Sequence, residues 1–412
     1  MNLLTPGYAA VLANGVYGVN ENPLLSAQKR VRLVGCEPDF SIPRPDHGDR
    51  HPFARSTTGG LPIPGVAALA ESLKPEIFAP VETDFGYVAM GNAPSWHGHM
   101  LVVTRGTMGP KGISPDWLSN YNIGLKTGPD GRLVHAGFYR AWQEMSSFVH
   151  RAVEQYRPAH IHCVGHSLGG ALANLNALSL AQSGYDVALY TFGAPRVGAL
   201  DFATELSVRL RERVKRVYHP ADPVPMIPLL PFLHAPLTYG IRLTAPAGAL
   251  IDADAHDMEL SYQTLVGGRE WDALERANTL LGDFQIDSWL QQAAKQRGGF
   301  VLASAALLER IAKGLSRLIK KAVFYVVGSG VSAAATATLT ALDFVAWLLS
   351  RAAAIANAIR EEITGLVNAI FGFLGRIGSS IADLTQSALR WVLGLLFTYL
   401  ANQARNALER LI

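Results

Sequence analysis

Short apolar runs alternate with amphipathic stretches through the middle of this chain, between residues 83 and 220. Runs of this length predict strands, and they read "DFGYVAMG", "GHMLVVTRGT", "AHIHCVG", "DVALYTFG" and "VKRVYHP". Longer stretches have the periodicity of helices, and they read "AGFYRAWQEMSSFVHRAVEQY", "SLGGALANLNALSLAQSG" and "ALDFATELSVRLRER". Strands that alternate with helices of this length are typical of a mostly parallel sheet covered on both faces. We therefore expect an α/β fold here.

The two ends of the chain differ from this central part. Residues 5–30 predict a helical segment, and residues 37–65 predict a loop insertion because they are rich in Pro, Gly and charge. After Gly298 the chain is rich in Ala, Leu, Ile and Val, contains no proline and predicts four or five helical segments. We expect an α/β domain over residues 1–297 and an all-α domain over residues 298–412.

The charge is unevenly divided between these parts. Of 412 residues, 49% are hydrophobic and 17% charged, which indicates a globular chain. The formal charge is +3, but the segment from Lys295 onward carries 13 Lys and Arg against 6 Asp and Glu. That segment is therefore the candidate for an anionic partner. We expect this partner to be lipid and not nucleic acid.

The termini and cysteines indicate where the protein is made. The start, "MNLLTPGYAAVLANGVYGV", has no basic n-region and is not a convincing secretory signal. Cys163 lies in a buried strand, so a disulfide with Cys36 is not expected. The abundance of Ala, Arg and Leu suggests a bacterium. We expect synthesis in the cytoplasm, followed by peripheral membrane association or export by another route.

The candidate chemistry centres on "GHSLG", which fits the motif G-x-S-x-G between a predicted strand and a predicted helix. Gly165 and Gly169 leave room for a cramped turn that presents Ser167 as a nucleophile. The following helix directs backbone N–H groups at an oxyanion formed there. Serine is a weak nucleophile, so a base and a group that orients the base are needed as well.

Two acids and two histidines compete for those roles. Asp222 follows the predicted strand "VKRVYHP", at the end where catalytic loops gather, whereas Asp201 opens a helix and fits a capping charge. His256 lies in a polar loop before a helix, whereas His234 lies beside an expected strand and fits a structural role. We favour Asp222 and His256. Neither the aspartate-flanked histidines His47 and His51 nor any other pattern indicates a metal or cofactor site.

Six motifs follow one another in the order seen in class 3 (fungal-type) lipases: "VVTRGT", "DWLSN", "VHAGF", "GHSLGGALA", "TFGAPRVG" and "DPVPMIP". The chain resembles that family over about residues 83–265. The resemblance implies an α/β-hydrolase fold that acts on carboxylic esters, with Ser167, Asp222 and His256 as the triad.

The same resemblance implies an oxyanion hole formed by the N–H of Leu168 together with Thr107. The sequence departs from the family at Asn120, where an acid is usual, and we expect only a local packing difference. The segment "MGPKGISPDW", where the family carries its lid, is short and holds few apolar residues.

The helical region suggests where such a nucleophile would act. Residues 306–323 predict a helix with an apolar face and a basic face, a pattern of peptides that lie on anionic membranes and also of bundle helices. The segment from Ala322 to Leu342 is uncharged and long enough to span a bilayer, although its small and polar residues make it a marginal insert.

We therefore expect a lipolytic serine hydrolase of membrane lipids, with phospholipase A activity. The alternatives are an esterase or triacylglycerol lipase with a scaffold helical domain, and a protein whose helices permeabilise membranes. The chain also resembles lipase effectors delivered by contact-dependent (type VI) secretion. That resemblance implies an antibacterial role, with a secretion-apparatus protein and an immunity protein as partners.

Overall fold

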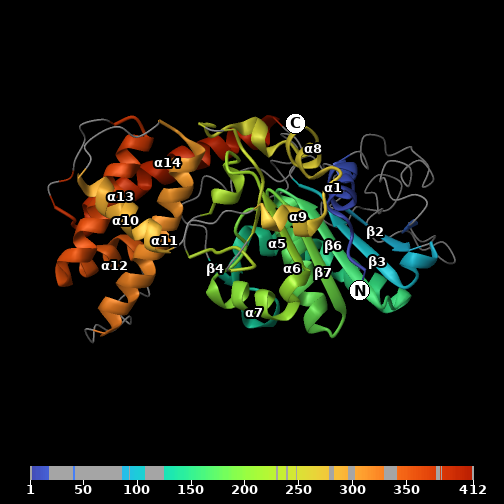
Figure 1. The fold of residues 1–412 in the computed structure, drawn as a ribbon. Coiled ribbons are helices and arrows are strands. Elements are labelled where there is room, and N and C mark those ends of the chain that lie inside the picture. Colours follow the sequence, from blue (N-terminus) through green and yellow to red (C-terminus); the bar gives the residue numbers. More distant parts are fainter. Residues whose placement is uncertain are drawn as a thin grey trace, which may run out of the picture.

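The computed structural model of the protein describes residues 2–17, 40–41, 86–91, 93–106, 125–228, 231–237, 240–246, 248–277, 283–295, 302–328, 341–376, 381 and 383–410. The described part forms a mostly parallel sheet, with helices on both faces, and a cluster of helices beside it (Figure 1).

The central sheet has seven strands within the described residues, in the order β1-β2-β3-β6-β7-β8-β9. Their bounds are Phe40–Ser41, Gly86–Gly91, His99–Thr104, His160–His166, Asp186–Phe192, Val214–Tyr218 and Ile241–Arg242. The strands from β3 to β9 run parallel, whereas β1 and β2 add an antiparallel edge. The inner strands are buried on both faces, which explains their continuous apolar runs. A separate pair joins β4 (Leu125–Thr127) and β5 (Leu133–His135).

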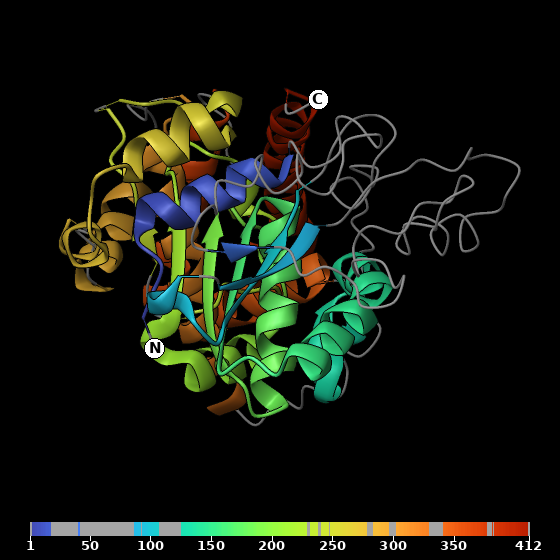
Figure 2. The same ribbon diagram turned by 90° about the vertical axis from the view of Figure 1, so that its right-hand side faces the viewer.

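Helices cover both faces of this sheet (Figures 1 and 2). On one face lie α5 (Ala136–Tyr156), α6 (Leu168–Gln182) and α7 (Leu200–Leu210), with α6 buried from Leu168 to Leu180. Across the other lies α1 (Pro6–Gly15). The segment before α1 is fixed at Leu4, whose N–H donates to the Tyr190 hydroxyl and whose carbonyl accepts from Trp271 Nε1.

The helical region consists of α10 (Asp283–Lys295), α11 (Ala305–Gly328), α12 (Ala341–Ile355), α13 (Asn357–Phe373) and α14 (Gln386–Arg410). Helices α10 and α13 approach closely, because a Cβ on Gly365 would lie only 1.9 Å from the Leu290 carbonyl oxygen. The apolar face of α11 is buried, with Ile311 and Leu318 fully covered. Ion pairs link α10 to α11 through Asp287, which contacts Arg317 and Lys321.

The sequence predicts most of this architecture, and the α/β-hydrolase fold followed by an all-α region is confirmed. The five predicted strands correspond to β2, β3, β6, β7 and β8, and the three predicted helices to α5, α6 and α7. Of the predicted loop insertion over 37–65, the structure describes only Phe40 and Ser41, which pair with β2 as β1. A two-residue strand leaves no periodic pattern in the sequence.

Other predictions concern residues that are partly outside the described ones. The predicted helix over 5–30 is present as α1, which ends at Gly15. The predicted boundary near residue 297 falls outside the described residues, between α10 and α11. The long uncharged segment begins within α11, but much of it is also outside them. None of the helices searched in the described ranges is long and apolar enough to cross a membrane.

Candidate active site

Ser167 lies on a sharp turn between β6 and α6. Its backbone has φ 57° and ψ −132°, a conformation that side-chain-bearing residues rarely adopt. The close packing around the turn requires glycine: a Cβ on Gly165 would lie 2.3 Å from the Gly169 carbonyl oxygen, and one on Gly169 would lie 2.3 Å from that of Thr104. The strain directs the Ser167 side chain beyond the carboxyl end of β6, as the sequence motif predicts.

The structure brings Ser167, His256 and Asp222 together. The Ser167 Oγ lies 2.9 Å from His256 Nε2, and His256 Nδ1 lies 2.8 Å from Asp222 Oδ2. All three residues are fully buried. Because the carboxylate can only accept, the Nδ1–H donates to Asp222, which leaves Nε2 to accept the serine proton. The arrangement can therefore activate a hydroxyl by general base chemistry.

Asp222 is held by three donors. Its Oδ1 accepts from the Val224 N–H at 2.8 Å, and its Oδ2 accepts from the Tyr262 hydroxyl at 2.6 Å as well as from His256. Burial raises the pKa of Tyr262 well above its ordinary value, and the neighbouring carboxylate raises that pKa further. Tyr262 therefore stays protonated as a donor. Its own oxygen accepts from the His219 N–H at 3.1 Å, so one tyrosine joins two turns of the site.

His166 contacts the backbone of His256. Its Nε2 lies 2.9 Å from the His256 carbonyl oxygen and must donate there, so its Nδ1 accepts from the Tyr17 hydroxyl at 2.7 Å. Burial lowers the pKa of His166 well below its ordinary value, and the proximity of His256 lowers it further. A neutral His166 thus connects α1 to the loop that carries His256.

Of the two residues predicted for the oxyanion hole, the structure describes Leu168 but not Thr107. Leu168 begins α6, so its N–H belongs to the first turn, whose N–H groups have no partner within the helix. Thr107 lies outside the described residues. Its neighbour Gly106 is described, and a Cβ there would lie 3.1 Å from the Ser167 Cβ. The chain therefore passes beside the nucleophile just before Thr107.

The rival candidates lie in structural positions. Asp201 accepts from the N–H groups of Leu133 and Phe202 in the first turn of α7. His234 Nε2 contacts the Pro225 carbonyl oxygen at 2.8 Å. Asp257, which follows His256 directly, accepts from the Leu260 N–H. These contacts account for each side chain without a catalytic role.

Sequence reasoning missed Tyr262, Tyr17 and Gly193 as parts of the site. A Cβ on Gly193 would lie 2.9 Å from Asp222 Oδ2 and 3.1 Å from His256 Nδ1. The glycine of "TFGAPRVG", directly after a predicted strand, is the one local signal for this position. Nothing near Tyr262 or Tyr17 in the sequence indicates their contacts. Among the described residues, no group of His, Cys, Asp and Glu could hold a metal ion.

The family comparison covers the part of the chain that contains Ser167 and Asp222. Residues 101–232 match the family described as lipase (class 3). The secreted mono- and diacylglycerol lipase 1 of Fusarium solani is 36% identical over 166 residues, which cover 39% of this chain and 45% of that protein. The phospholipase A1-II 4 of Oryza sativa subsp. japonica is 29% identical over 205 residues, 43% of this chain and 50% of that protein. The chain thus spans about half the length of these relatives.

Among solved structures, the mono- and diacylglycerol lipase from Aspergillus oryzae is similar to this chain. It is 27% identical, with 43% of this chain and 65% of that chain covered and a TM-score of 0.34.

Proposed function

We propose that this protein is a lipolytic serine hydrolase, and the match of residues 101–232 to the lipase (class 3) family supports this. The observation that carries the proposal is the buried chain of contacts from Ser167 through His256 to Asp222. A nucleophilic hydroxyl beside a base that a carboxylate orients is the arrangement that serine-based acyl transfer uses.

The proposed reaction proceeds in two steps. Ser167 Oγ attacks the ester carbonyl carbon while its proton passes to His256 Nε2, and the oxyanion accepts hydrogen bonds from the Leu168 N–H and Thr107. Collapse of this intermediate breaks the ester bond, and His256 returns the proton to the leaving alcohol. Water then attacks the acyl-enzyme with His256 again as base. This step releases the fatty acid and restores Ser167.

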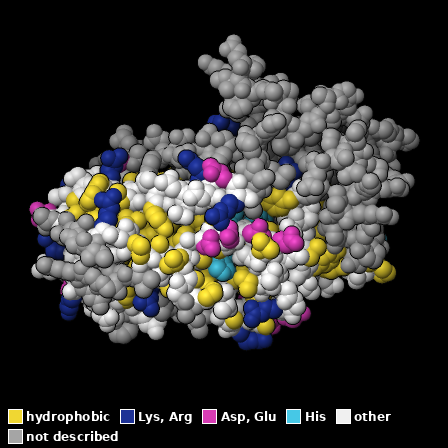
Figure 3. Space-filling view, turned by 90° about the horizontal axis from the view of Figure 1, so that it is seen from above, with side chains coloured by type: hydrophobic (Ala, Val, Ile, Leu, Met, Phe, Trp, Pro, Cys, Tyr) yellow, Lys and Arg dark blue, Asp and Glu magenta, His cyan; other side chains and the backbone are white. Residues whose placement is uncertain are grey.

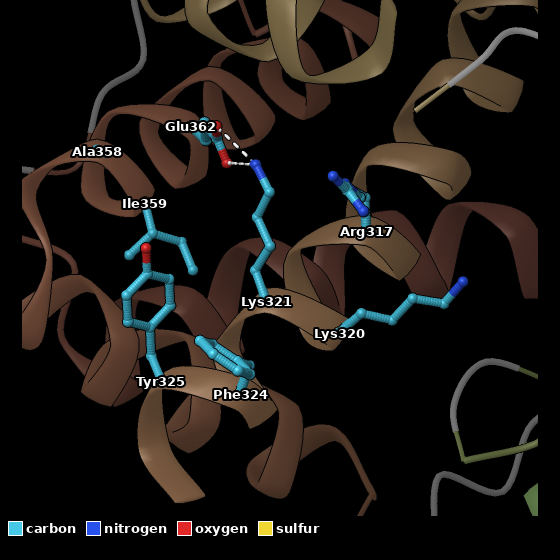
Figure 4. A pocket seen from close by; sticks show the side chains of 8 residues that line it. All are labelled: Arg317, Lys320, Lys321, Phe324, Tyr325, Ala358, Ile359 and Glu362. Carbon is cyan, nitrogen blue, oxygen red and sulfur yellow. Dashed lines mark hydrogen bonds and ion pairs between the residues drawn. The ribbon is translucent and has the colours of Figure 1, made fainter. Parts of the chain in front are cut away.

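We further propose that the substrate is a membrane phospholipid. The helical region supports this through a concave site on α11 and α13 that holds three cations, Arg317, Lys320 and Lys321 (Figure 4). Phe324 lies beside them and is 77% exposed. Lysines next to an exposed aromatic side chain suit the interface of an anionic bilayer, where the ring enters the headgroup layer. Phospholipase A1-II 4, a relative, is named for this substrate class.

One observation favours the alternative of a scaffold helical domain with a soluble ester or triacylglycerol as substrate. The apolar face of α11 is buried within the protein, and Lys321 pairs with Asp287 and Glu362. Membrane contact through α11 is thus restricted to the polar side and the end of the helix.

Seen from above, the surface of the helical region carries many hydrophobic side chains (Figure 3). The antibacterial role and its protein partners stay predictions.

The test is mass spectrometry of vesicles that contain phosphatidylglycerol, phosphatidylethanolamine and triacylglycerol, after incubation with the intact chain and with Ser167→Ala. We expect the intact chain to release fatty acid and lysophospholipid, and Ser167→Ala to be slower by on the order of 10³-fold or more. Ser146→Ala, which removes a hydroxyl on the outside of α5, is the control and should keep full activity. Lipid hydrolysis by Ser167→Ala at the normal rate would overturn the proposal. Release from triacylglycerol alone would favour the scaffold alternative.

A further inference from the structure

The loop that carries His256 is attached to the helical region through its backbone. The Ala305 N–H donates to the Ala249 carbonyl at 2.8 Å, and the Ile251 N–H donates to the Ala303 carbonyl at 2.9 Å. Leu250 and Ser304 pair between them as an antiparallel bridge. The segment that leads into α11 therefore acts as a short strand beside the chain that leads to His256.

The end of α14 lies against the same loop. Helix α14 contacts the short helix η7 (Ala253–His256) and also η6 (Val224–Met226), which begins two residues after Asp222. Arg410, at the end of α14, forms an ion pair with Asp254 of η7. Figure 1 shows α14 extending from the helical cluster to the top of the sheet. One helix thus touches the turns that carry both the base and its orienting carboxylate.

The last turns of α14 are packed as core. Leu408 and Ala404 are fully buried, while the Arg410–Asp254 pair is largely exposed. An exposed ion pair contributes little, about 0–1 kcal/mol. Apolar burial at this helix end therefore contributes more to the attachment than the ion pair does.

A third attachment joins α11 to the strands behind Asp222. Glu309 accepts from Arg242 Nε at 2.9 Å and from its Nη2 at 3.0 Å. The Tyr218 hydroxyl also contacts Glu309 at 3.4 Å. Tyr218 ends β8, and Asp222 follows four residues later. The helical region is therefore fixed to the α/β unit on the side where the triad lies.

On its inner side the loop is held by the His256 side chain, which contacts Asp222 and Ser167, and by two hydrogen bonds of its backbone. The Asp252 N–H donates to the Ala221 carbonyl at 3.0 Å, and His166 contacts the His256 carbonyl at 2.9 Å. Ile251, Ala253 and Ala255 of the loop are buried, and a catalytic base must stay within about 0.5 Å of its productive position. The contacts from the helical region restrict the loop from its outer side.

We propose that the helical region is a positioning element of the active site, and that the end of α14 keeps His256 in place for catalysis. Leu408 and Arg410 are positioning residues that act through η7. This inference rests on the proposed role of His256 as the base. It has a direct consequence: removal of residues 298–412 would disable hydrolysis even of an ester that never meets a membrane.

The test uses full-chain variants and a soluble ester, p-nitrophenyl butyrate, below its solubility limit, so that membrane binding plays no part. Leu408→Asp places a charge in a buried position and should detach the last turns of α14. We expect kcat to fall between about 10- and 100-fold, because a displacement near 1 Å can cost this much, with KM changed little. Hydrogen–deuterium exchange of a peptide covering residues 249–257 should become faster.

The matched control is Leu389→Asp, the same substitution of a buried leucine on the same helix. It lies 19 residues before Leu408, about 28 Å away along the helix axis, and so cannot act on η7 directly. We expect a lower melting temperature but an unchanged kcat in folded protein. The milder variant Arg410→Asp should lower kcat by about 3-fold through repulsion of Asp254. The swap Asp254→Arg with Arg410→Asp should restore it.

The outcomes separate this inference from the proposed function. An unchanged kcat in Leu408→Asp, or an equal loss in Leu389→Asp, would overturn the positioning role while Ser167-dependent hydrolysis stands. Hydrolysis of the soluble ester by Ser167→Ala would instead overturn the proposed function, and the positioning role with it. A selective loss of kcat in Leu408→Asp, with faster exchange of the loop, would establish the inference.

Discussion

Tyr262 shows how much of the triad's geometry depends on one hydroxyl group. It donates to Asp222 at 2.6 Å and accepts from the His219 N–H at 3.1 Å, in a fully buried setting. A hydrogen bond to a buried carboxylate contributes about 1.5–3 kcal/mol. Without it, Asp222 is less well fixed and orients His256 less accurately.

Tyr262→Phe should therefore reduce kcat on a soluble ester by about 10- to 100-fold, with little change in KM. Tyr190→Phe is the matched control, because the Tyr190 hydroxyl is equally buried but contacts the Leu4 N–H and His162. It should lower stability and leave kcat unchanged. Equal kcat values for the two variants would show that the Tyr262 hydroxyl has no part in positioning Asp222.

The same tyrosine marks a limit of sequence reasoning. Ser167 can be predicted because its role depends on neighbours in the chain: a strand before it, a helix after it and glycine on either side. Tyr262 is separated from Asp222 by 40 positions. It reaches the carboxylate only because a π-helical turn, Met258–Gln263, follows His256. No local pattern predicts that turn, so the contact requires the fold.

Among the elements, the turn after β7 constrains the positions of Asp222 and His256 closely. Gly193 directly follows that strand with φ 58°, and a Cβ there would lie within about 3 Å of Asp222, Tyr262 and His256. All three contacts are tighter than ordinary van der Waals separation. The turn can pass beneath the triad only as glycine.

Gly193→Ala should abolish most of the activity, by about 10²-fold or more, because the new methyl group displaces the carboxylate and the imidazole. Gly184→Ala is the control: Gly184 also has a positive φ, 91°, but open space where the Cβ would lie. Both variants should lose about 1 kcal/mol of stability from backbone strain. A comparable loss of kcat in the two variants would assign the effect to strain and contradict crowding as its cause.

The order of helices and strands along the chain is better predicted from the sequence than the way in which they pack together. Buried parallel strands such as β6 and β7 have continuous apolar runs that are recognisable without a structure. The helices of the C-terminal region are recognisable as well, since the buried positions of α11 recur at helical spacing. The way in which these helices dock on the α/β unit is not recognisable from the sequence. Contacts such as that of Arg410 with Asp254 join residues 156 positions apart. Pattern alone therefore suggested a separate domain, while the contacts join it to the active site.

Across the whole molecule, the helical region combines two sides with different physical properties. One side holds the His256 loop and is apolar and buried, with Leu408 and Ala404 as examples. The other includes Lys320, Phe324 and Tyr325 at the end of α11 and is open to solvent (Figure 4). The two sides use different residues, so positioning of the base and membrane binding can be separated by mutation.

Membrane binding is tested by Lys320→Glu combined with Phe324→Ser in the full chain. A cation near an anionic surface contributes about 1 kcal/mol, and burial of a phenyl ring contributes about 1.5–3 kcal/mol. The double variant should bind phosphatidylglycerol vesicles about 50- to 1,000-fold more weakly. It should lose vesicle hydrolysis to a similar degree and keep its kcat on p-nitrophenyl butyrate.

The matched control reverses one exposed charge and removes one exposed apolar side chain elsewhere, Lys126→Glu with Val208→Ser. Its net charge change equals that of the test variant, so a general loss of positive charge would affect both alike. High salt should weaken the intact protein and the control more than the test variant, since screening removes only electrostatic attraction that is still present. Equal vesicle binding by both double variants would exclude the end of α11 as the membrane contact. A scaffold role for the helical region, in which it holds His256 and leaves substrate access to the α/β unit, would then be the better account.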